Sequence, residues 1–398
     1  MISEKMVTWG TQGCSIREIA AYGEQRAAVV GAENVFNFTI GNPSAPAPDC
    51  VRQTITHLLE TVPAEQLHAY TAAPGLASVR EKMASYLHSS FGVPYRAEDI
   101  YMTSGASSAL AMLSYALLSP GDEMITLSPY FSEYKLYAEA AGGYLTAVPS
   151  RPDDFQIDLD ALAAAVNEKT AVVLLNSPNN PSGVILSAES IKELSVLLTQ
   201  RSEQYGHPIY IVADEPYREL AYDGEAVPFI PAYYKDTIYC YSFSKTLSLP
   251  GERIGFLAIH PQTTAYARVR AAIYGAGRAL GYICTPALMQ LTVAACIGQT
   301  ADISIYKQNR DLIYTALLEM GFTCVKPSGA FYLFLETPEP DAKAFCQKAM
   351  ALDLLVVPGD DFGCPGYVRL AYCVKKDMLV RSLPRFRQLA EQYGLKAR

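Results

Sequence analysis

The chain contains the stretch Thr237-Ile238-Tyr239-Cys240-Tyr241-Ser242-Phe243-Ser244-Lys245, followed shortly by Leu249-Pro250-Gly251-Glu252-Arg253-Ile254-Gly255. Its apolar first part is typical of a strand, so we expect Lys245 just past the carboxyl end of that strand, among small hydroxyl side chains. A partly desolvated amine can lose its proton and attack a carbonyl group, and a nearby guanidinium suits a phosphate. Together, Lys245 and Arg253 suggest a Schiff base to a phosphorylated aldehyde cofactor. The alternative is a solvated lysine in a loop.

The composition indicates a globular protein with room for two domains. The chain has 398 residues, half of them apolar, and its net charge is 32 − 40 = −8. That length suits one large α/β domain plus a smaller one. No basic run points to a nucleic-acid partner, and ordinary solubility accounts for the acidity.

The nine cysteines are scattered and form no CxxC pair. This pattern favours a reducing compartment over a disulfide framework, and it argues against a zinc site, so we expect no metal. The first residues lack the apolar region of a signal peptide, and no apolar run is long enough to span a membrane. We therefore predict a cytoplasmic protein without a membrane partner.

Short apolar runs alternate with longer helical patterns between about residues 99 and 260. Helical patterns at Ser108–Leu118, Asp158–Asn167 and Ser187–Arg201 separate several of these runs. This alternation predicts an α/β fold with a mainly parallel sheet, covered by helices on both faces, and with ligands beyond the carboxyl ends of the strands. The seven expected strands are Ile100–Thr103, Glu123–Leu127, Tyr144–Val148, Ala171–Asn176, Ile209–Ala213, Thr237–Ser242 and Gly255–His260.

The pattern changes after about residue 286. A long helical pattern runs from Ala287 towards Met320, and a basic amphipathic helix at Asp377–Tyr393 closes the chain. Further strands are expected at Ala330–Glu336, Leu354–Val357 and Tyr367–Tyr372. With an extended linker at Gly41–Pro48, these patterns predict a large domain at 45–285 and a smaller α+β domain built from 1–44 and 286–398.

A turn of small residues, Ser104, Gly105, Ala106 and Ser107, follows the first of the seven strands and opens a helix. Glycine and alanine let the backbone approach a ligand, and the first free N–H groups of a helix favour an anion. The alternative is a plain strand-to-helix connection capped by serine.

Two other strand ends carry polar residues. Asn180 lies in the turn-rich loop 176–183 and can present its amide to a phenolic or carboxylate oxygen; the alternative is a simple turn. Asp214 can pair with a cation such as a pyridinium nitrogen, which makes the ring an electron sink, or it can be a helix N-cap. Tyr217, three positions on, can donate to an oxygen on that ring.

Arg369 stands alone in the otherwise apolar strand Tyr367–Tyr372. A guanidinium in a half-buried strand needs an anion as partner. A substrate carboxylate held by two parallel hydrogen bonds would serve, and the alternative is an internal salt bridge.

These signals occur together and in the order found in the class I/II aminotransferases, of the pyridoxal-phosphate fold-type I superfamily, and the chain resembles that family from Gly41 to Arg369. The resemblance implies a large domain with a mainly parallel seven-stranded sheet plus a smaller α+β domain. It also implies pyridoxal 5'-phosphate as cofactor, L-amino acids and 2-keto acids as substrates, and a homodimer with shared active sites.

By this resemblance, Lys245 binds the cofactor and moves the proton, and Asp214 pairs with the pyridine nitrogen. Asn180 and Tyr217 match the pair at the ring oxygen, and Phe131 matches the aromatic residue that stacks on the ring. The resemblance assigns the phosphate to Gly105, Ala106, Ser107, Ser242, Arg253 and, from the neighbouring subunit, Tyr70.

The resemblance also assigns substrate contacts. Arg369 matches the arginine that binds the α-carboxylate, and Gly41 matches a glycine whose backbone faces the substrate, as Asn180 does with its side chain. Arg278 lies in the region where dicarboxylate-specific members place a second arginine; the alternative is a surface or dimer-interface arginine.

The chain departs from the family pattern after the lysine. Many members have a bulky aromatic residue where this chain has Glu252, and methionine-threonine where it has Leu249-Pro250. The string 244–251 also resembles the aminocyclopropane-carboxylate synthases, relatives that eliminate rather than transaminate.

An aminotransferase is our main prediction. One alternative is a pyridoxal-phosphate lyase, either such a synthase or a cysteine/cystathionine β-lyase. Another is a non-catalytic sensing protein, but such regulators have a DNA-binding domain before this fold, and the roughly forty residues before the linker are too few for one.

Overall fold

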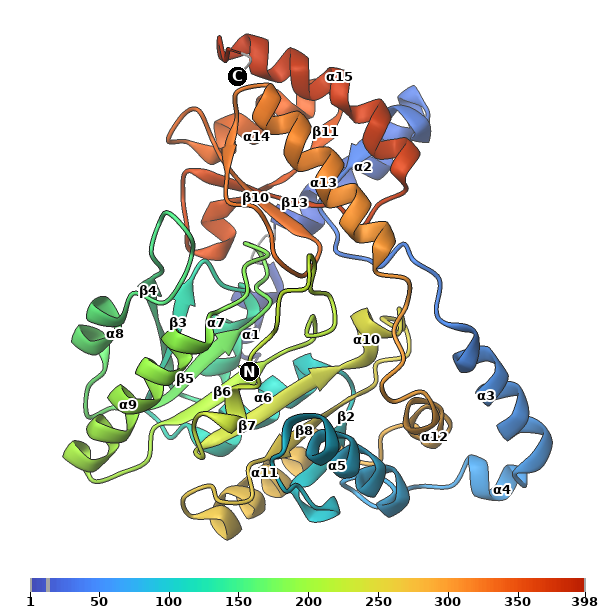
Figure 1. The fold of residues 1–398 in the computed structure, drawn as a ribbon, viewed down its shortest axis with the longest axis vertical. Helices are drawn as coiled ribbons and strands as arrows, with labels where there is room; N and C mark the ends of the chain where they lie inside the picture. The colour runs from blue at the N-terminus through green and yellow to red at the C-terminus, as the bar shows by residue number, and fades with distance from the viewer. Residues whose placement is uncertain (1, 12–14, 397–398) are drawn as a thin grey trace. The chain divides into compact units, whose positions relative to one another are not determined.

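Residues 2–11 and 15–396 are described by the computed structural model, which is drawn as a ribbon in Figure 1. The chain divides into two units. The larger unit comprises Pro43–Ile305 and Ser328–Ala330. The smaller unit comprises Met1–Asn42, Tyr306–Pro327 and Phe331–Arg398.

A seven-stranded sheet runs through the larger unit in the order β2-β8-β7-β6-β5-β3-β4. β8 is antiparallel to both of its neighbours, and the other adjacent strands are parallel. The predicted α/β fold with a mainly parallel seven-stranded sheet is therefore confirmed, and each strand lies within one residue of its expected bounds. The strands are β2 (Ile100–Thr103), β3 (Glu123–Ser128), β4 (Tyr144–Pro149), β5 (Thr170–Asn176), β6 (Tyr210–Asp214), β7 (Thr237–Ser242) and β8 (Gly255–Ile259).

Helices cover both faces of this sheet, because its inner strands are apolar on both sides. On β6, Ile211 and Ala213 belong to one apolar core, and Val212 belongs to the other. The first core includes residues of α5, α9 and α12, and the second includes residues of α6, α7 and α11. The helices of this unit are α3 (Asp49–Thr61), α4 (Ala64–Leu67), α5 (Ala77–Phe91), α6 (Ala106–Leu117), α7 (Glu133–Ala140), α8 (Leu159–Ala165), α9 (Ala188–Tyr205), α10 (Phe243–Thr246), α11 (Tyr266–Leu280) and α12 (Ala287–Ala295).

The smaller unit contains two small sheets. Four antiparallel strands lie in the order β12-β13-β10-β9, and β1 is parallel to β11. The expected strand Leu354–Val357 is divided, since its first half pairs with β1 and its second half with β13. The elements are α1 (Glu4–Thr11), α2 (Ser15–Val30), β1 (Phe36–Asn37), most of α13 (Ser304–Glu319), β9 (Thr323–Cys324), β10 (Tyr332–Glu336), α14 (Ala342–Ala351), β11 (Leu354–Leu355), β12 (Val357–Pro358), β13 (Tyr367–Ala371) and α15 (Lys376–Gln392).

The boundary after α12 differs from the expected division at residue 285. The long helix expected from Ala287 towards Met320 is wrong, because α12 and α13 are separated by residues 296–303. Gly298 lies in this break with a φ of 81°, a left-handed conformation that suits glycine. Met289 and Val293 of α12 belong to the core that also contains α5 residues, so the larger unit extends to Ile305.

Candidate active site

Lys245 lies on α10, a single helical turn that follows β7 directly. Ser242 begins this turn, and its Oγ accepts a hydrogen bond from the backbone N–H of Ser244 at 3.2 Å, as N-cap serines do. The Ser242 hydroxyl also donates to Oγ of Ser244 at 2.8 Å. Lys245 is half-buried. It thus lies at the carboxyl end of β7 beside small hydroxyl groups.

Groups that suit an anion surround the turn between β2 and α6. Gly105 has a φ of 79°, and an added Cβ there would lie 2.9 Å from a guanidinium nitrogen of Arg253. The same guanidinium lies 3.5 Å from Oγ of Ser244. Ala106 and Ser107 begin α6, where the first backbone N–H groups have no acceptor within the helix. A guanidinium, hydroxyl groups and a helix N-terminus together suit a phosphate.

The order of the strands brings these groups together. β8 lies between β2 and β7, and its first residue, Gly255, pairs with Thr103 on one side and with Ser242 on the other. Arg253 is two residues before Gly255. It is therefore held beside both the turn after β2 and the start of α10.

Asp214 ends β6 as a buried carboxylate, 5% exposed. The hydroxyl of Tyr134 on α7 donates to its Oδ2 at 2.6 Å. Within residues 2–11 and 15–396, the buried Oδ1 atom has no hydrogen-bond partner. Burial raises the pKa of Asp214 to about 7, and the Tyr134 hydrogen bond opposes that rise. A buried oxygen without a donor is costly, so Oδ1 is suited to accept a hydrogen bond from a ligand.

Asn180 and Tyr217 are both buried, in the segments that follow β5 and β6. Asn176, the last residue of β5, connects these segments. Its side-chain N–H donates to the carbonyl oxygen of Asp214 at 2.8 Å, and its Oδ1 accepts from the backbone N–H of Asn180 at 2.7 Å. Because β5 and β6 are parallel neighbours, the segments after them lie at the same edge of the sheet.

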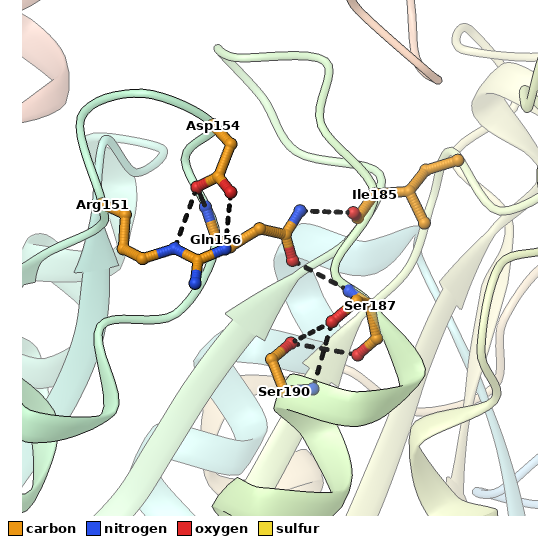
Figure 2. Close-up of polar contacts among 6 residues, drawn as sticks. All are labelled: Arg151, Asp154, Gln156, Ile185, Ser187 and Ser190. Atoms are coloured by element: carbon orange, nitrogen blue, oxygen red, sulfur yellow. Dashed lines mark hydrogen bonds and ion pairs between the residues drawn. The ribbon is translucent and has the colours of Figure 1, made fainter.

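The loop that contains Asn180 is fixed at its far end by Gln156 (Figure 2). The Nε2–H of Gln156 donates to the carbonyl of Ile185, and its Oε1 accepts from the backbone N–H of Ser187, both at 2.9 Å. Asp154 in turn accepts from the backbone N–H of Gln156 at 3.0 Å. These bonds restrain the loop between β5 and α9, and with it the backbone of Asn180.

Phe131 and Tyr134 lie at the start of α7, with ring centroids 5.6 Å apart in an edge-to-face arrangement. Sequence analysis identified Phe131 and missed Tyr134. The bond from Tyr134 to Asp214 joins residues 80 positions apart, which no local pattern reveals. Its only sequence signal is an aromatic residue three positions after Phe131 at a helix start.

Arg369 and Gly41 belong to the smaller unit. Arg369 is buried in β13, where its guanidinium carbon lies 4.7 Å from the ring centroid of Tyr332 and 4.8 Å from that of Phe362. It also donates to the carbonyl of Thr39. An added Cβ on Gly41 would lie 2.0 Å from the hydroxyl oxygen of Tyr332, so a side chain there would collide with that ring.

Tyr70 and Arg278 are exposed residues of the larger unit. Tyr70 follows α4, and 97% of its surface is accessible. Arg278 lies at an exposed position in the last turn of α11, and whether it selects a side-chain carboxylate or is a surface or dimer-interface arginine stays open.

A lysine, a buried aspartate and an anion-binding turn at neighbouring strand ends form the type of site used by pyridoxal-phosphate enzymes of fold type I. The model of the family "Aminotransferase class I and II" matches residues 33–385. The chain therefore belongs to this family, whose members depend on pyridoxal phosphate.

Named relatives agree with this assignment. The aspartate/prephenate aminotransferase of Thermus thermophilus is 30% identical over 354 residues, covering 87% of this chain and 89% of that protein. An aminotransferase structure from Eubacterium rectale has a TM-score of 0.97 at 48% identity and 99% coverage of both chains. The aspartate aminotransferase of Thermus thermophilus with maleate has a TM-score of 0.85 at 26% identity, covering 98% of this chain and 99% of that one. These similarities support amino acid aminotransferase activity and do not favour a lyase or a non-catalytic sensing protein.

The residues present fit pyridoxal phosphate. Oδ1 of Asp214 needs a donor, and a protonated pyridine nitrogen is one. Arg253, the hydroxyl of Ser244 and the N-terminus of α6 suit a phosphate. Lys245 follows β7, the strand next to β6, so the amine and the carboxylate belong to adjacent strand ends.

Tyr134→Phe should raise the pKa of Asp214 further in the cofactor-free protein. A hydrogen bond to a charged group is worth about 1.5–3 kcal/mol, which corresponds to roughly one to two pH units. The carboxyl of Asp214 binds its proton more tightly in the folded protein than in the unfolded chain. The folded protein therefore loses stability as the pH rises from 3.8, the ordinary pKa of an aspartate, to about 7, the pKa of Asp214. In Tyr134→Phe that fall should continue to higher pH.

Carbon NMR of labelled aspartate carboxyls, assigned with Asp214→Asn, measures this titration. Tyr234→Phe is the matched control, since that buried hydroxyl donates to the carbonyl of Ile209 instead. Equal Asp214 midpoints in the wild type and Tyr134→Phe would contradict the role assigned to Tyr134.

Proposed function

We propose that this aminotransferase binds pyridoxal phosphate at Lys245 and moves an amino group between an L-amino acid and a 2-keto acid such as 2-oxoglutarate. The observation that supports this most strongly is the buried Oδ1 of Asp214, which lacks a donor within the described ranges. Structural side chains of a stable core normally have their hydrogen bonds satisfied. A carboxylate oxygen left this way at a sheet edge suits a cationic N–H from a ligand.

When bound, the cofactor supplies an electron sink for the electron pair left when the amino acid loses its Cα proton. Oδ1 of Asp214 would accept a hydrogen bond from the protonated pyridine nitrogen and so stabilise its positive charge. Asn180 and Tyr217 orient the ring through its oxygen, and Phe131 covers one ring face. Asn180 and Tyr217 are buried in the segments after β5 and β6, which excludes water from that side of the site.

The phosphate is assigned to the turn after β2. Gly105, Ala106 and Ser107 offer backbone N–H groups, and Ser242 and Arg253 approach from the segments that flank β7 and β8. The guanidinium and the N-terminus of α6 would hold the phosphate dianion and so anchor one end of the cofactor.

Lys245 is assigned the proton transfer. In its neutral form, the Nζ amine would take up the proton that the amino acid loses at Cα and hold it for return. Lys245 is half-buried at the carboxyl end of β7, beside the hydroxyl groups of Ser242 and Ser244.

Arg369 is proposed to bind the α-carboxylate of the substrate, with the backbone of Gly41, which belongs to the same unit, as a further contact. Two aromatic rings lie beside the buried guanidinium of Arg369, and a guanidinium can hold a carboxylate by two parallel hydrogen bonds.

A homodimer with shared active sites is also proposed. Tyr70 is almost fully exposed, and Tyr282 and Ile283 are 37% and 41% exposed. The backbone N–H of Cys284 donates to the carbonyl of Ala73, so the segment 282–284 lies beside the one that follows Tyr70. An exposed apolar group of this kind suits a partner subunit, to whose phosphate site Tyr70 would contribute. In the part of the chain that is described, no helix could cross a membrane, and the cytoplasmic location stays a prediction.

Borohydride reduction of the protein with pyridoxal phosphate should attach the cofactor to Lys245. Peptide mapping by mass spectrometry identifies the labelled residue, and Lys235→Ala, which removes an exposed lysine of the same unit, is the control that should keep the label. A label on another lysine, or no visible absorbance on adding the cofactor, would refute the proposed function.

Arg369→Lys should weaken amino acid and keto acid binding together, because an ammonium cannot reproduce the two parallel hydrogen bonds. The expected loss is about 2 kcal/mol, or roughly thirtyfold in KM, while the cofactor's absorbance stays the same. Steady-state kinetics with amino acids and with amines that lack a carboxylate measure the effect. Unchanged KM values with a lower melting temperature would instead support the internal salt bridge.

Mixing Tyr70→Phe with Lys245→Ala should restore activity at limiting cofactor. In a shared-site dimer, each hybrid has one site that contains neither substitution. Activity after mixing and size by light scattering measure this outcome. A fully active monomer, or a mixture no more active than the sum of its parts, is incompatible with sites shared in this way.

A further inference from the structure

The helical turn that contains Lys245 is too short to fix its own orientation. α10 has four residues, and its backbone bonds near the C-terminal end are long, from Leu247 N–H to the carbonyl of Phe243 at 3.3 Å and from Ser248 N–H to that of Lys245 at 3.4 Å. An isolated turn of this length is unstable, since helix nucleation costs more than one hydrogen bond returns. Its orientation must therefore come from side chains at its two ends.

Ser242 holds the first end, and Thr246 holds the second. The Thr246 hydroxyl donates to Oε2 of Glu219 at 2.7 Å, and Oγ1 of Thr246 lies 2.8 Å from the hydroxyl of Tyr241. The carbonyl of Thr246 accepts from the backbone N–H of Ala301 at 2.7 Å. Thr246 and Tyr241 are buried. The residue next to Lys245 is thus held by three contacts from three other parts of the larger unit.

Glu219 connects this helical turn to the other half of the site. It lies five residues after Asp214 and two after Tyr217, in the turn that follows β6. A bond from Thr246 to Glu219 therefore joins the segment after β7 to the segment after β6. The carboxylate pKa is raised by burial, and the hydrogen bonds from Thr246 and Tyr241 oppose that rise.

We propose that Glu219, acting through Thr246, is a positioning residue that sets the place of the Lys245 amine relative to Asp214 and Tyr217. The proposal rests on the proposed function, because only a lysine that transfers a proton needs this alignment. Proton transfer depends steeply on donor–acceptor geometry, so a displaced turn should slow that step far more than it weakens substrate binding.

Glu219→Ala and Thr246→Val each remove one partner of the bond. We expect kcat to fall roughly ten- to hundredfold, with the KM of the keto acid unchanged. The isotope effect on kcat with Cα-deuterated amino acid should rise, since proton transfer becomes more rate-limiting. The visible circular dichroism of the bound cofactor should also change in amplitude, a readout that does not depend on turnover.

Glu219→Gln and Thr246→Ser preserve an acceptor and a donor, so they should recover most of the rate. If Glu219 acts through Thr246, the double variant Glu219→Ala/Thr246→Val should lose no more than the worse single variant. If Glu219→Ala does not fold, the pair Thr246→Val and Thr246→Ser decides the question alone.

Thr170→Val is the matched control. The Thr170 hydroxyl donates to the buried carboxylate of Glu123 at 2.6 Å, at the start of β5 and thus at the opposite edge of the sheet. The Thr170→Val variant should have a lower melting temperature but the same isotope effect on kcat and the same visible dichroism as the wild type. If Thr246→Val behaves like Thr170→Val, the bond is only structural and the proposal is wrong. If the wild-type protein takes up no cofactor at Lys245, the proposed function itself fails, which is a separate outcome.

Discussion

A carboxylate buried at the end of β6 is the constraint on which the site depends. Removing an ionised group from water costs several kcal/mol unless hydrogen bonds replace the lost solvation. For Asp214, the described part of the chain supplies one side-chain donor, Tyr134, and leaves the second oxygen without one. The folded protein is therefore less stable at this point than it could be, and a ligand that donates an N–H would recover that loss.

The residue after Asp214 is held in the core by an ion pair. Glu215 is fully buried and pairs with Arg218 at 2.6 Å, and the guanidinium carbon of Arg218 lies 4.3 Å from the ring centroid of Phe91. Breaking such a buried pair by removing one partner typically costs about 3–5 kcal/mol. The turn after β6 is thus anchored by an ion pair that faces the core. Asp214 itself keeps one carboxylate oxygen, Oδ1, without a hydrogen-bond donor in the described part of the chain.

The parts of the fold that sequence reasoning could predict were those encoded locally. Strands such as Thr237–Ser242 are short apolar runs with β-branched or aromatic residues, and each strand of the seven-stranded sheet was found within one residue. The break between α12 and α13 was missed because the apolar residues on both sides of Gly298 were taken as one helical pattern, although Gly298 itself is a local signal for a break.

For the site, too, residues in short sequence motifs could be predicted, whereas residues that depend on a distant partner could not. Lys245, Asp214 and Asn180 could be proposed from short strings at strand ends. Tyr134 and Glu219 could not, because each matters only through a partner 80 or 27 positions away in the chain. A hydrogen bond between such distant side chains depends on strand order and helix placement, which no local string contains.

The reversed direction of β8 explains why one short connection can place Lys245 and Arg253 at the same edge of the sheet. In a wholly parallel sheet, a residue just before a strand lies at the edge opposite the preceding strand's carboxyl end. Because β8 is antiparallel to β7, Arg253 lies before β8 yet at the same edge as Lys245, which follows β7. No crossover helix is needed, so eight residues suffice to place an amine and a guanidinium at one edge. The same reversal places Gly255 between Thr103 and Ser242, so direct strand pairing joins the turn after β2 to the segment that contains Lys245.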